Sequence, residues 1–131
     1  MPQTGLVVGA TATPLPGLSI QGVMNYYDKN YADWSPGDRE IEGGTADRDQ
    51  VWMAPGYSKI DLHAYYNLPM QVAGTNIQLF AHVFNLTDAL FIQDATDNSQ
   101  YNSFDKDHDA DSAEIFFGTP RYVNMGLSVR F

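Results

Sequence analysis

Hydrophobic and polar residues alternate along several segments of the chain, and this period of two predicts β-strands. The alternation is clearest over residues 57–68, where Ile60, Leu62 and Leu68 occupy even positions and most charged or polar residues occupy odd ones. Comparable segments cover residues 5–13, 17–27, 76–86 and 122–131. The sequence therefore predicts an all-β fold of about five strands, each about ten residues long. The strand at 76–86 is apolar on both sides, so its facing is left open.

The connections between these strands alternate in length. Residues 14–17 read Pro-Leu-Pro-Gly, a strong turn sequence, and residues 69–75 form a second short and uncharged connection. Residues 28–56 and 87–118 are long and polar, and we expect both to be loops. No connection has the pattern of a crossover helix, so neighbouring strands should pair antiparallel in a meander.

Charge is concentrated in the two long connections. The formal net charge is −9, and residues 28–49 and 94–114 each hold seven acidic residues. Such acidity argues against a nucleic-acid partner, because phosphate binding needs clustered Lys and Arg. The rest of the chain is nearly uncharged.

Strands of this length, with short turns at one end and long loops at the other, are typical of transmembrane β-barrels. A soluble antiparallel sandwich alternates in the same way and is the second interpretation. Loop asymmetry and charge segregation favour the barrel. The chain has no apolar run long enough for a transmembrane helix and no visible signal peptide, so an exported protein should begin upstream of Met1.

Two segments resemble motifs of a known family of outer-membrane β-barrels. Residues 83–88, Val-Phe-Asn-Leu-Thr-Asp, resemble the penultimate-strand motif of TonB-dependent outer-membrane receptors. Residues 117–131 are similar to the C-terminus of that family, where a Gly-x-Pro-Arg entry leads into a strand closing on Phe. The residues that carry the match are Asn85, Leu86, Asp88, Gly118, Pro120 and Arg121. The turn at 14–17 and the Pro-Gly-Tyr at 55–57 also resemble these receptors.

The resemblance implies a 22-stranded barrel with an N-terminal plug, of which residues 1–131 would supply the last five strands. The plug and the segment that engages the TonB complex would be absent. Five strands cannot close a barrel, so the remainder of the barrel is an expected partner. The parent protein would lie in the cell outer membrane among lipid. There it would import a small-molecule nutrient, such as a siderophore, metal complex, glycan or vitamin, with energy from TonB.

The last predicted strand resembles the signal that the barrel assembly machinery reads. Its residues are Val123, Met125, Gly126, Leu127, Val129 and Phe131. A terminal strand can be recognised through its free edge and its alternating side chains. The simpler interpretation is that the apolar members only face lipid, and both interpretations can hold together.

Aromatic residues in and beside the long connections are candidate ligand contacts. Tyr31, Trp34, Trp52 and Tyr101 could stack on a sugar or an aromatic siderophore, although packing within the loops is the favoured role. Of the histidines, His63 lies on the polar face of its strand, and we interpret it as wall lining.

Acidic residues at alternate positions suggest calcium only weakly. Asp105, Asp107 and Asp109 are spaced as in a calcium loop, but Ala110 stands where an EF-hand needs Gly and Phe116 where it needs Glu. We therefore prefer a solvated acidic loop and expect no cofactor.

Catalysis is not expected. The chain has no cysteine, and no nucleophile stands with a base or with paired carboxylates. The alternative to a receptor is a soluble β-sandwich module that binds carbohydrate or calcium.

Overall fold

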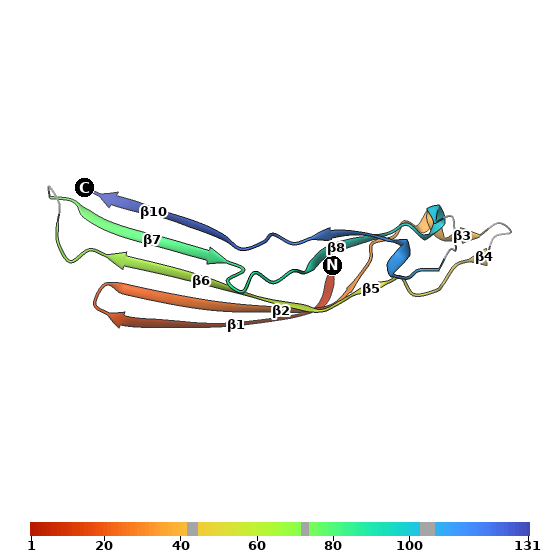
Figure 1. Ribbon diagram of the computed structural model, residues 1–131, viewed down its shortest axis with the longest axis horizontal. Coiled ribbons are helices and arrows are strands. Elements are labelled where there is room, and N and C mark those ends of the chain that lie inside the picture. Colours follow the sequence, from red (N-terminus) through yellow and green to blue (C-terminus); the bar gives the residue numbers. More distant parts are fainter. Residues whose placement is uncertain (42–44, 72–73, 103–106) are drawn as a thin grey trace. The chain divides into compact units, whose positions relative to one another are not determined.

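The protein is built almost entirely of β-strands (Figure 1). The computed structural model describes residues 1–41, 45–71, 74–102 and 107–131. The strands are β1 (Pro2–Leu15), β2 (Leu18–Tyr31), β3 (Glu40–Ile41), β4 (Thr45–Ala46), β5 (Met53–Ala54), β6 (Tyr57–Asn67), β7 (Asn76–Phe84), β8 (Ile92–Asp97), β9 (Ala113–Phe117) and β10 (Tyr122–Arg130). The short 3-10 helices are η1 (Pro36–Arg39), η2 (Ser99–Tyr101) and η3 (Ala110–Ser112). The predicted all-β class is confirmed.

The chain divides into two compact units. The sheet unit contains Leu6–Tyr26, Ser58–Ala89 and Thr119–Phe131. The loop unit contains Met1–Gly5, Tyr27–Tyr57 and Leu90–Gly118.

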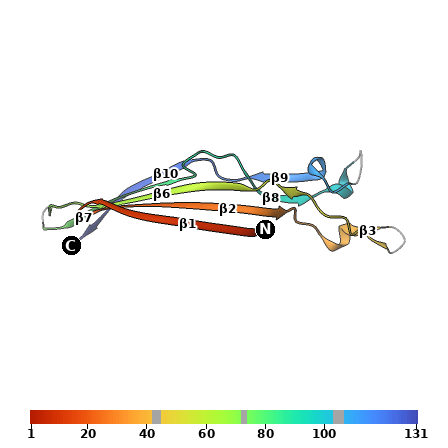
Figure 2. The same ribbon diagram turned by 90° about the horizontal axis from the view of Figure 1, so that it is seen from below.

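The five long strands follow one another across a single sheet in the order β1-β2-β6-β7-β10. Figure 2 shows these strands as one layer. β7 pairs antiparallel with both β6 and β10, and the register places His63 opposite His82 and Met125 opposite Ala81. This is the predicted meander. The first two strands are longer than predicted, because β1 starts at Pro2 and β2 continues to Tyr31.

The register also settles how β7 faces. Leu62 of β6 and Val123 of β10 both lie opposite Val83, so Val83 shares their face. The alternate residues of β7 follow it, and we call this side the apolar face. The polar face carries His63, His82 and Asn124, which stand in one row across β6, β7 and β10.

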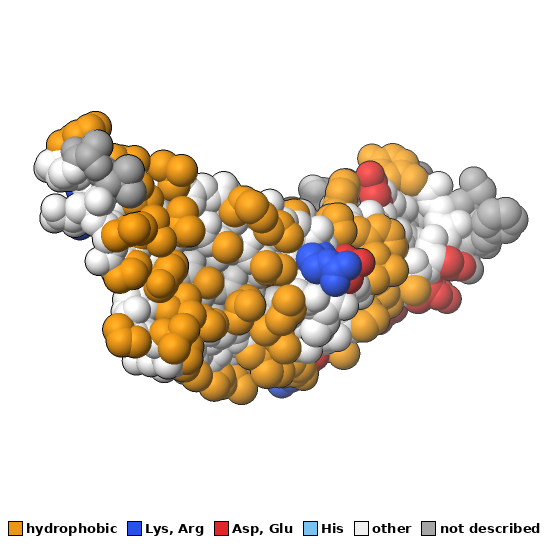
Figure 3. Space-filling view, turned by 60° about the vertical axis from the view of Figure 1, so that its left-hand side comes forward, with side chains coloured by type: hydrophobic (Ala, Val, Ile, Leu, Met, Phe, Trp, Pro, Cys, Tyr) orange, Lys and Arg blue, Asp and Glu red, His pale blue; other side chains and the backbone are white. Residues whose placement is uncertain are grey.

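The apolar face is uncovered, and Figure 3 shows hydrophobic side chains spread over the molecular surface. On this face Met125 is 72% exposed, Leu127 61% and Val123 54%. In the described part of the sheet unit no hydrophobic residue is buried. The buried side chains there are Asp61 and Asn85.

A Pro-Gly pair makes the predicted turn between β1 and β2. Gly17 has φ +82°, a conformation that glycine adopts without a Cβ penalty. Its carbonyl oxygen accepts a hydrogen bond of 2.8 Å from the backbone N–H of Asn67. A Cβ on Gly17 would lie 2.7 Å from the carbonyl oxygen of Asn67, so the turn needs glycine on two counts.

The loop unit has a small core of its own. Ala32, Val51 and Ala95 are buried together, and Tyr31 and Trp52 pack against them. A parallel bridge joins Asp33 to Thr96 and so ties the two long connections together.

The prediction that residues 28–56 and 87–118 are loops was therefore wrong in part. They contain the antiparallel pairs β3–β4 and β8–β9, and β5 pairs with the end of β2. β3, β4 and β5 have two residues each, too few to show alternation. β8 and β9 are longer, but their residues do not alternate strictly, and their pairing has an irregularity between Ile92 and Asp94.

Candidate functional site

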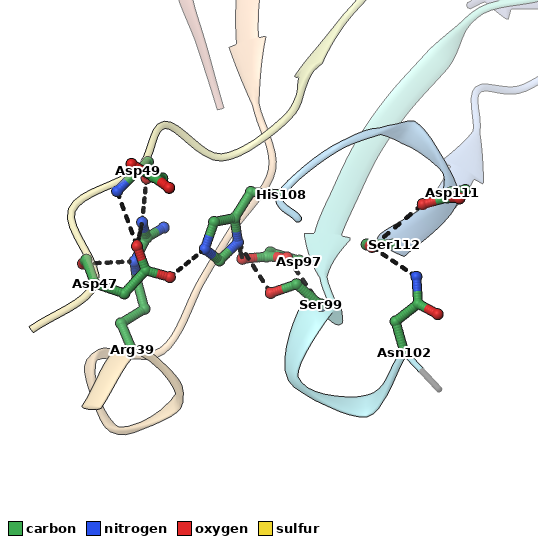
Figure 4. A network of polar contacts seen from close by, with 9 residues as sticks. All are labelled: Arg39, Asp47, Asp49, Asp97, Ser99, Asn102, His108, Asp111 and Ser112. Atoms are coloured by element: carbon green, nitrogen blue, oxygen red, sulfur yellow. Dashed lines mark hydrogen bonds and ion pairs between the residues drawn. The ribbon is translucent and has the colours of Figure 1, made fainter. Parts of the chain in front are cut away.

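His108 lies at the centre of a polar network in the loop unit (Figure 4). Its Nε2 is 2.5 Å from Oδ2 of Asp47, and its Nδ1 is 2.6 Å from Oδ2 of Asp97. The imidazole is nearly buried, with 5% of its side chain exposed. A carboxylate only accepts hydrogen bonds, so both ring nitrogens must donate, and the ring is an imidazolium. The hydroxyl oxygen of Ser99 is a second hydrogen-bond partner of Nδ1, at 2.9 Å.

The electrostatics agree with this protonation state. Burial lowers the pKa of His108, but the hydrogen bonds to Asp47 and Asp97 outweigh it and raise the pKa above the usual 6.5. The same contact, with His108 as donor, is the largest cause that holds the pKa of Asp47 below 3.8. This hydrogen-bonded ion pair joins residues that are 61 positions apart in the sequence.

Arg39 extends the network. Its guanidinium is almost buried, donates to the backbone carbonyl oxygens of Asp47 and Asp49, and pairs with the Asp47 carboxylate at 3.5 Å. It also stands 5.2 Å from the ring centroid of Trp34, within cation–π range. A hollow of about 470 Å³ is lined by Trp34, Arg39, Asp47, Arg48, Asp49, Gln50 and Val51. An exposed aromatic ring beside fixed charges suits a small polar ligand with a flat face.

The four aromatic candidates separate into two kinds. Trp34 and Tyr101 are exposed, at 52% and 76%. Tyr31 and Trp52 instead pack against the small core of the loop unit. The structure thus leaves Trp34 and Tyr101 available for a ligand and gives the other two a structural role.

The acidic stretch before η3 is arranged around its own backbone. The carboxylate of Asp109 accepts a hydrogen bond of 3.2 Å from the backbone N–H of Asp111 and so caps η3. Asp107 is exposed, and Asp105 lies outside the described residues. Within the described parts of the chain, no group of three or more His, Asp or Glu side chains is placed to hold a metal ion.

The two segments that resemble receptor motifs contact each other through residues of the sheet unit. Asn85 is buried, and its side-chain amide donates to the carbonyl oxygens of Ala89 at 3.0 Å and Thr119 at 3.2 Å. Its Oδ1 accepts from the N–H of Ala89 at 2.9 Å. Both Asn85, at φ +51°, and Asp88, at φ +53°, are left-handed, a conformation that Asn and Asp tolerate better than most residues.

Asp88 and Arg121 make the second connection between the motifs. The Asp88 carboxylate accepts a hydrogen bond of 2.9 Å from the backbone N–H of Arg121. The guanidinium of Arg121 reaches the carbonyl oxygen of Leu86 at 3.5 Å, while Pro120 is exposed. The motif residues thus build a chain reversal after β7, which we call the Asn85 corner.

Two glycines of the candidate set make room for phenyl rings. A Cβ on Gly118 would lie 2.0 Å from the ring of Phe91, which itself stacks on Tyr57 with centroids 4.3 Å apart. A Cβ on Gly126 would lie 2.6 Å from the ring of Phe80, its partner in the β7–β10 register. Glycine opposite an aromatic residue is a recurrent pairing in sheets.

The other candidates of the last strand form part of the uncovered apolar face. Val123, Met125, Leu127, Val129 and Phe131 are all exposed. Sequence reasoning missed the network around His108 and the pairing of His63 with His82. The only signal for the former was a histidine inside an acidic run, which does not name its partners.

Comparison of the chain with protein-family models, curated proteins and solved structures found no match. Among the described residues, no helix is long and apolar enough to cross a membrane.

Proposed function

We propose that the chain forms the C-terminal part of the barrel wall of a TonB-dependent outer-membrane receptor, a nutrient importer. The observation that carries this proposal is the uncovered apolar face of the five-stranded meander. A contiguous apolar surface is rare on a soluble monomer and marks a surface that meets lipid or another protein. Its opposite face carries His63, Asp61 and Asn124, as the lumen side of a barrel strand would.

The strand edges support the same proposal. β1 and β10 end the strand order, so each leaves one edge without a partner in the described chain. Bare edges are prohibitively costly in lipid. The remainder of the barrel is the partner that removes this cost, and the barrel assembly machinery would add the strand ending near Phe131.

The soluble sandwich is less well supported. A sandwich buries the inner faces of two packed sheets in a hydrophobic core. In the described sheet unit the buried residues are Asp61 and Asn85, both polar. The exposed side chains of Met125 and Leu127 have no counterpart sheet.

In this proposal the loop unit contributes extracellular loops. The hollow beside Trp34, with Tyr101 exposed elsewhere in the unit, would take part in binding the nutrient. The candidate nutrients remain a siderophore, a metal complex, a glycan or a vitamin. The TonB complex and the plug would act through parts of the receptor beyond these strands.

Site-directed spin labelling tests the proposal. The chain has no cysteine, so a single Cys can be placed at Met125 or Leu127, and, as matched controls on the other face of the same strand, at Asn124 or Ser128. In detergent micelles we expect oxygen to relax the labels at 125 and 127, and a water-soluble nickel chelate to relax those at 124 and 128. Equal accessibility on both faces would overturn the proposal. So would a monomeric, cooperatively unfolding chain in buffer without detergent.

A further inference from the structure

Two histidines face each other on the polar face of the sheet. His63 of β6 and His82 of β7 are directly opposite in the register, and their Nδ1 atoms are 2.8 Å apart. Both side chains are half-buried, so water-borne solutes reach them. Neither belongs to the His108 network or to the Asn85 corner.

The separation of the two nitrogens matches a specific coordination geometry. Metal–imidazole bonds are about 2.0–2.1 Å long, so two nitrogens at about 90° around one metal lie about 2.8–3.0 Å apart. A tetrahedral metal would need about 3.3 Å between them. The observed 2.8 Å therefore fits adjacent positions of a square-planar or octahedral ion. Cu²⁺ and Ni²⁺ prefer such geometries, and Cu²⁺ binds nitrogen ligands most tightly.

Neighbouring rings hold both imidazoles in place. The ring of His63 stands edge-on to Phe84, with centroids 5.5 Å apart. The ring of His82 contacts those of Tyr65 and Phe80, with centroids 5.4 Å and 5.5 Å away. Ligands already fixed by packing lose little conformational entropy on binding, which favours chelation.

Asp61, two residues before His63 on the same strand face, already has partners. The carboxylate of Asp61 accepts from the backbone N–H of Asn85 and the amide of Asn25, and pairs with Lys59 at 3.4 Å. It is therefore not offered as a third ligand. Asn124 stands beside His82 in the same row, and its amide oxygen or water would complete the coordination.

We propose that His63 and His82 form a cross-strand site for a divalent transition-metal ion, with Cu²⁺ the preferred ion. A bound ion takes the place of the hydrogen bond between the two Nδ1 atoms. The site rests on the β6–β7 register and does not depend on which medium covers the apolar face.

Copper titration of the intact chain tests the site, with CuCl₂ as the probe. It is done in whichever medium, detergent or buffer, gives a β-sheet circular dichroism spectrum. We expect one tight Cu²⁺ site whose electron paramagnetic resonance spectrum shows two equatorial nitrogens. His63→Phe and His82→Phe should each lower the affinity about tenfold or more, because a chelating pair becomes a single imidazole.

His82→Gln is the matched control for structure. Its amide can still hydrogen-bond to His63 but binds Cu²⁺ poorly, so copper affinity should fall while the unfolding midpoint stays unchanged. His108 remains in every variant, and the double variant His63→Phe/His82→Phe measures binding elsewhere. The proposal is overturned if the unsubstituted chain binds no tighter than this double variant, or if its spectrum shows a single nitrogen.

Discussion

The carboxylate of Asp61, in the middle of β6, accepts a hydrogen bond of 2.9 Å from the backbone N–H of Asn85, just after the end of β7. Both residues are buried, at 8% and 2% exposure. A buried carboxylate needs such partners, because an unpaired one costs several kcal/mol. The bond therefore fixes where β7 ends relative to β6, and the Asn85 corner starts from that fixed point.

Two substitutions of Asn85 should separate the contribution of its side-chain hydrogen bonds from that of its left-handed backbone conformation. Asn85→Ala removes three side-chain hydrogen bonds. It also places alanine, which adopts the left-handed conformation less readily than asparagine, at φ +51°. We therefore expect the free energy of unfolding to fall by about 2–4 kcal/mol. Asn85→Gly keeps the backbone conformation and should lose about 1 kcal/mol less. Urea unfolding of the chain in detergent micelles, followed by circular dichroism, measures both. Equal losses would show that the backbone conformation contributes nothing.

The His108 network should give the loop unit a pH-dependent stability. The pKa of His108 is raised on folding, so its contribution is complete below about pH 6.5 and is lost as pH rises through the raised value. The pKa of Asp47 is lowered, so its contribution is complete above pH 3.8 and is lost as pH falls through the lowered value. Protection factors of the amides near Asp47 and His108, which correct for the intrinsic pH dependence of hydrogen exchange, should thus be largest between these limits.

His108→Gln is the control for that profile. It removes the positive charge between two carboxylates, so we expect a local loss of about 1–3 kcal/mol below about pH 6.5. In the variant the protection should no longer change with pH near neutrality. A wild-type profile that stays flat while His108 titrates would contradict the imidazolium assignment. The shift of the His108 ring protons in NMR gives that titration directly.

Gly126 and Phe80 should behave as one unit. Gly126→Ala places a Cβ 2.6 Å from the Phe80 ring, which must turn away, and we expect about 1–2 kcal/mol of destabilisation. In the background of Phe80→Leu the same substitution should cost less than about 0.5 kcal/mol. A double-mutant cycle by thermal unfolding in detergent micelles measures the coupling. Additive effects would mean that the ring does not occupy the space above Gly126.

Replacing Trp34 and Trp52 by alanine should change the stability by different amounts. Trp34 is 52% exposed beside the hollow, and Trp34→Ala should change stability by less than about 1 kcal/mol, mainly through the lost contact with Arg39. Trp52 packs against the core of the loop unit, and Trp52→Ala should cost about 2–4 kcal/mol. Each variant leaves one tryptophan, so acrylamide quenching reports each ring separately. Stronger quenching of Trp52 than of Trp34 would reverse this assignment.

The sequence contained enough information for the meander and too little for the loop unit. Strands such as β6 show their alternation directly, and Pro16–Gly17 marks the turn before β2. The facing of β7 was undecidable because Phe80 and Leu79 are equally apolar, and only the partners in β6 and β10 assign them to faces. Strands as short as β5, with two residues, carry no period at all.

The candidate site residues also differ in whether their partners are close in the sequence, and only those in contiguous motifs could be predicted. Asn85 and Asp88 were found through a contiguous motif, although their structural role, a hydrogen-bonded corner, was not visible. The partners of His108 are 11 and 61 residues away, and no spacing rule joins them. Trp34 and Trp52 are chemically identical in the sequence, so only packing distinguishes an exposed ring from a core ring.

The side chain of Asn85 holds Ala89 and Thr119 at once, although 29 residues separate them in the chain. Residues 90–118 therefore leave and rejoin the sheet unit at two points that the Asn85 side chain holds close together. The entropy cost of closing a loop grows slowly with its length, so the length of this stretch adds little to the cost of pairing β7 with β10. Sequence change within residues 90–118 should therefore disturb their own contacts with residues 27–57, such as the Asp33–Thr96 bridge, more than the pairing of β7 with β10.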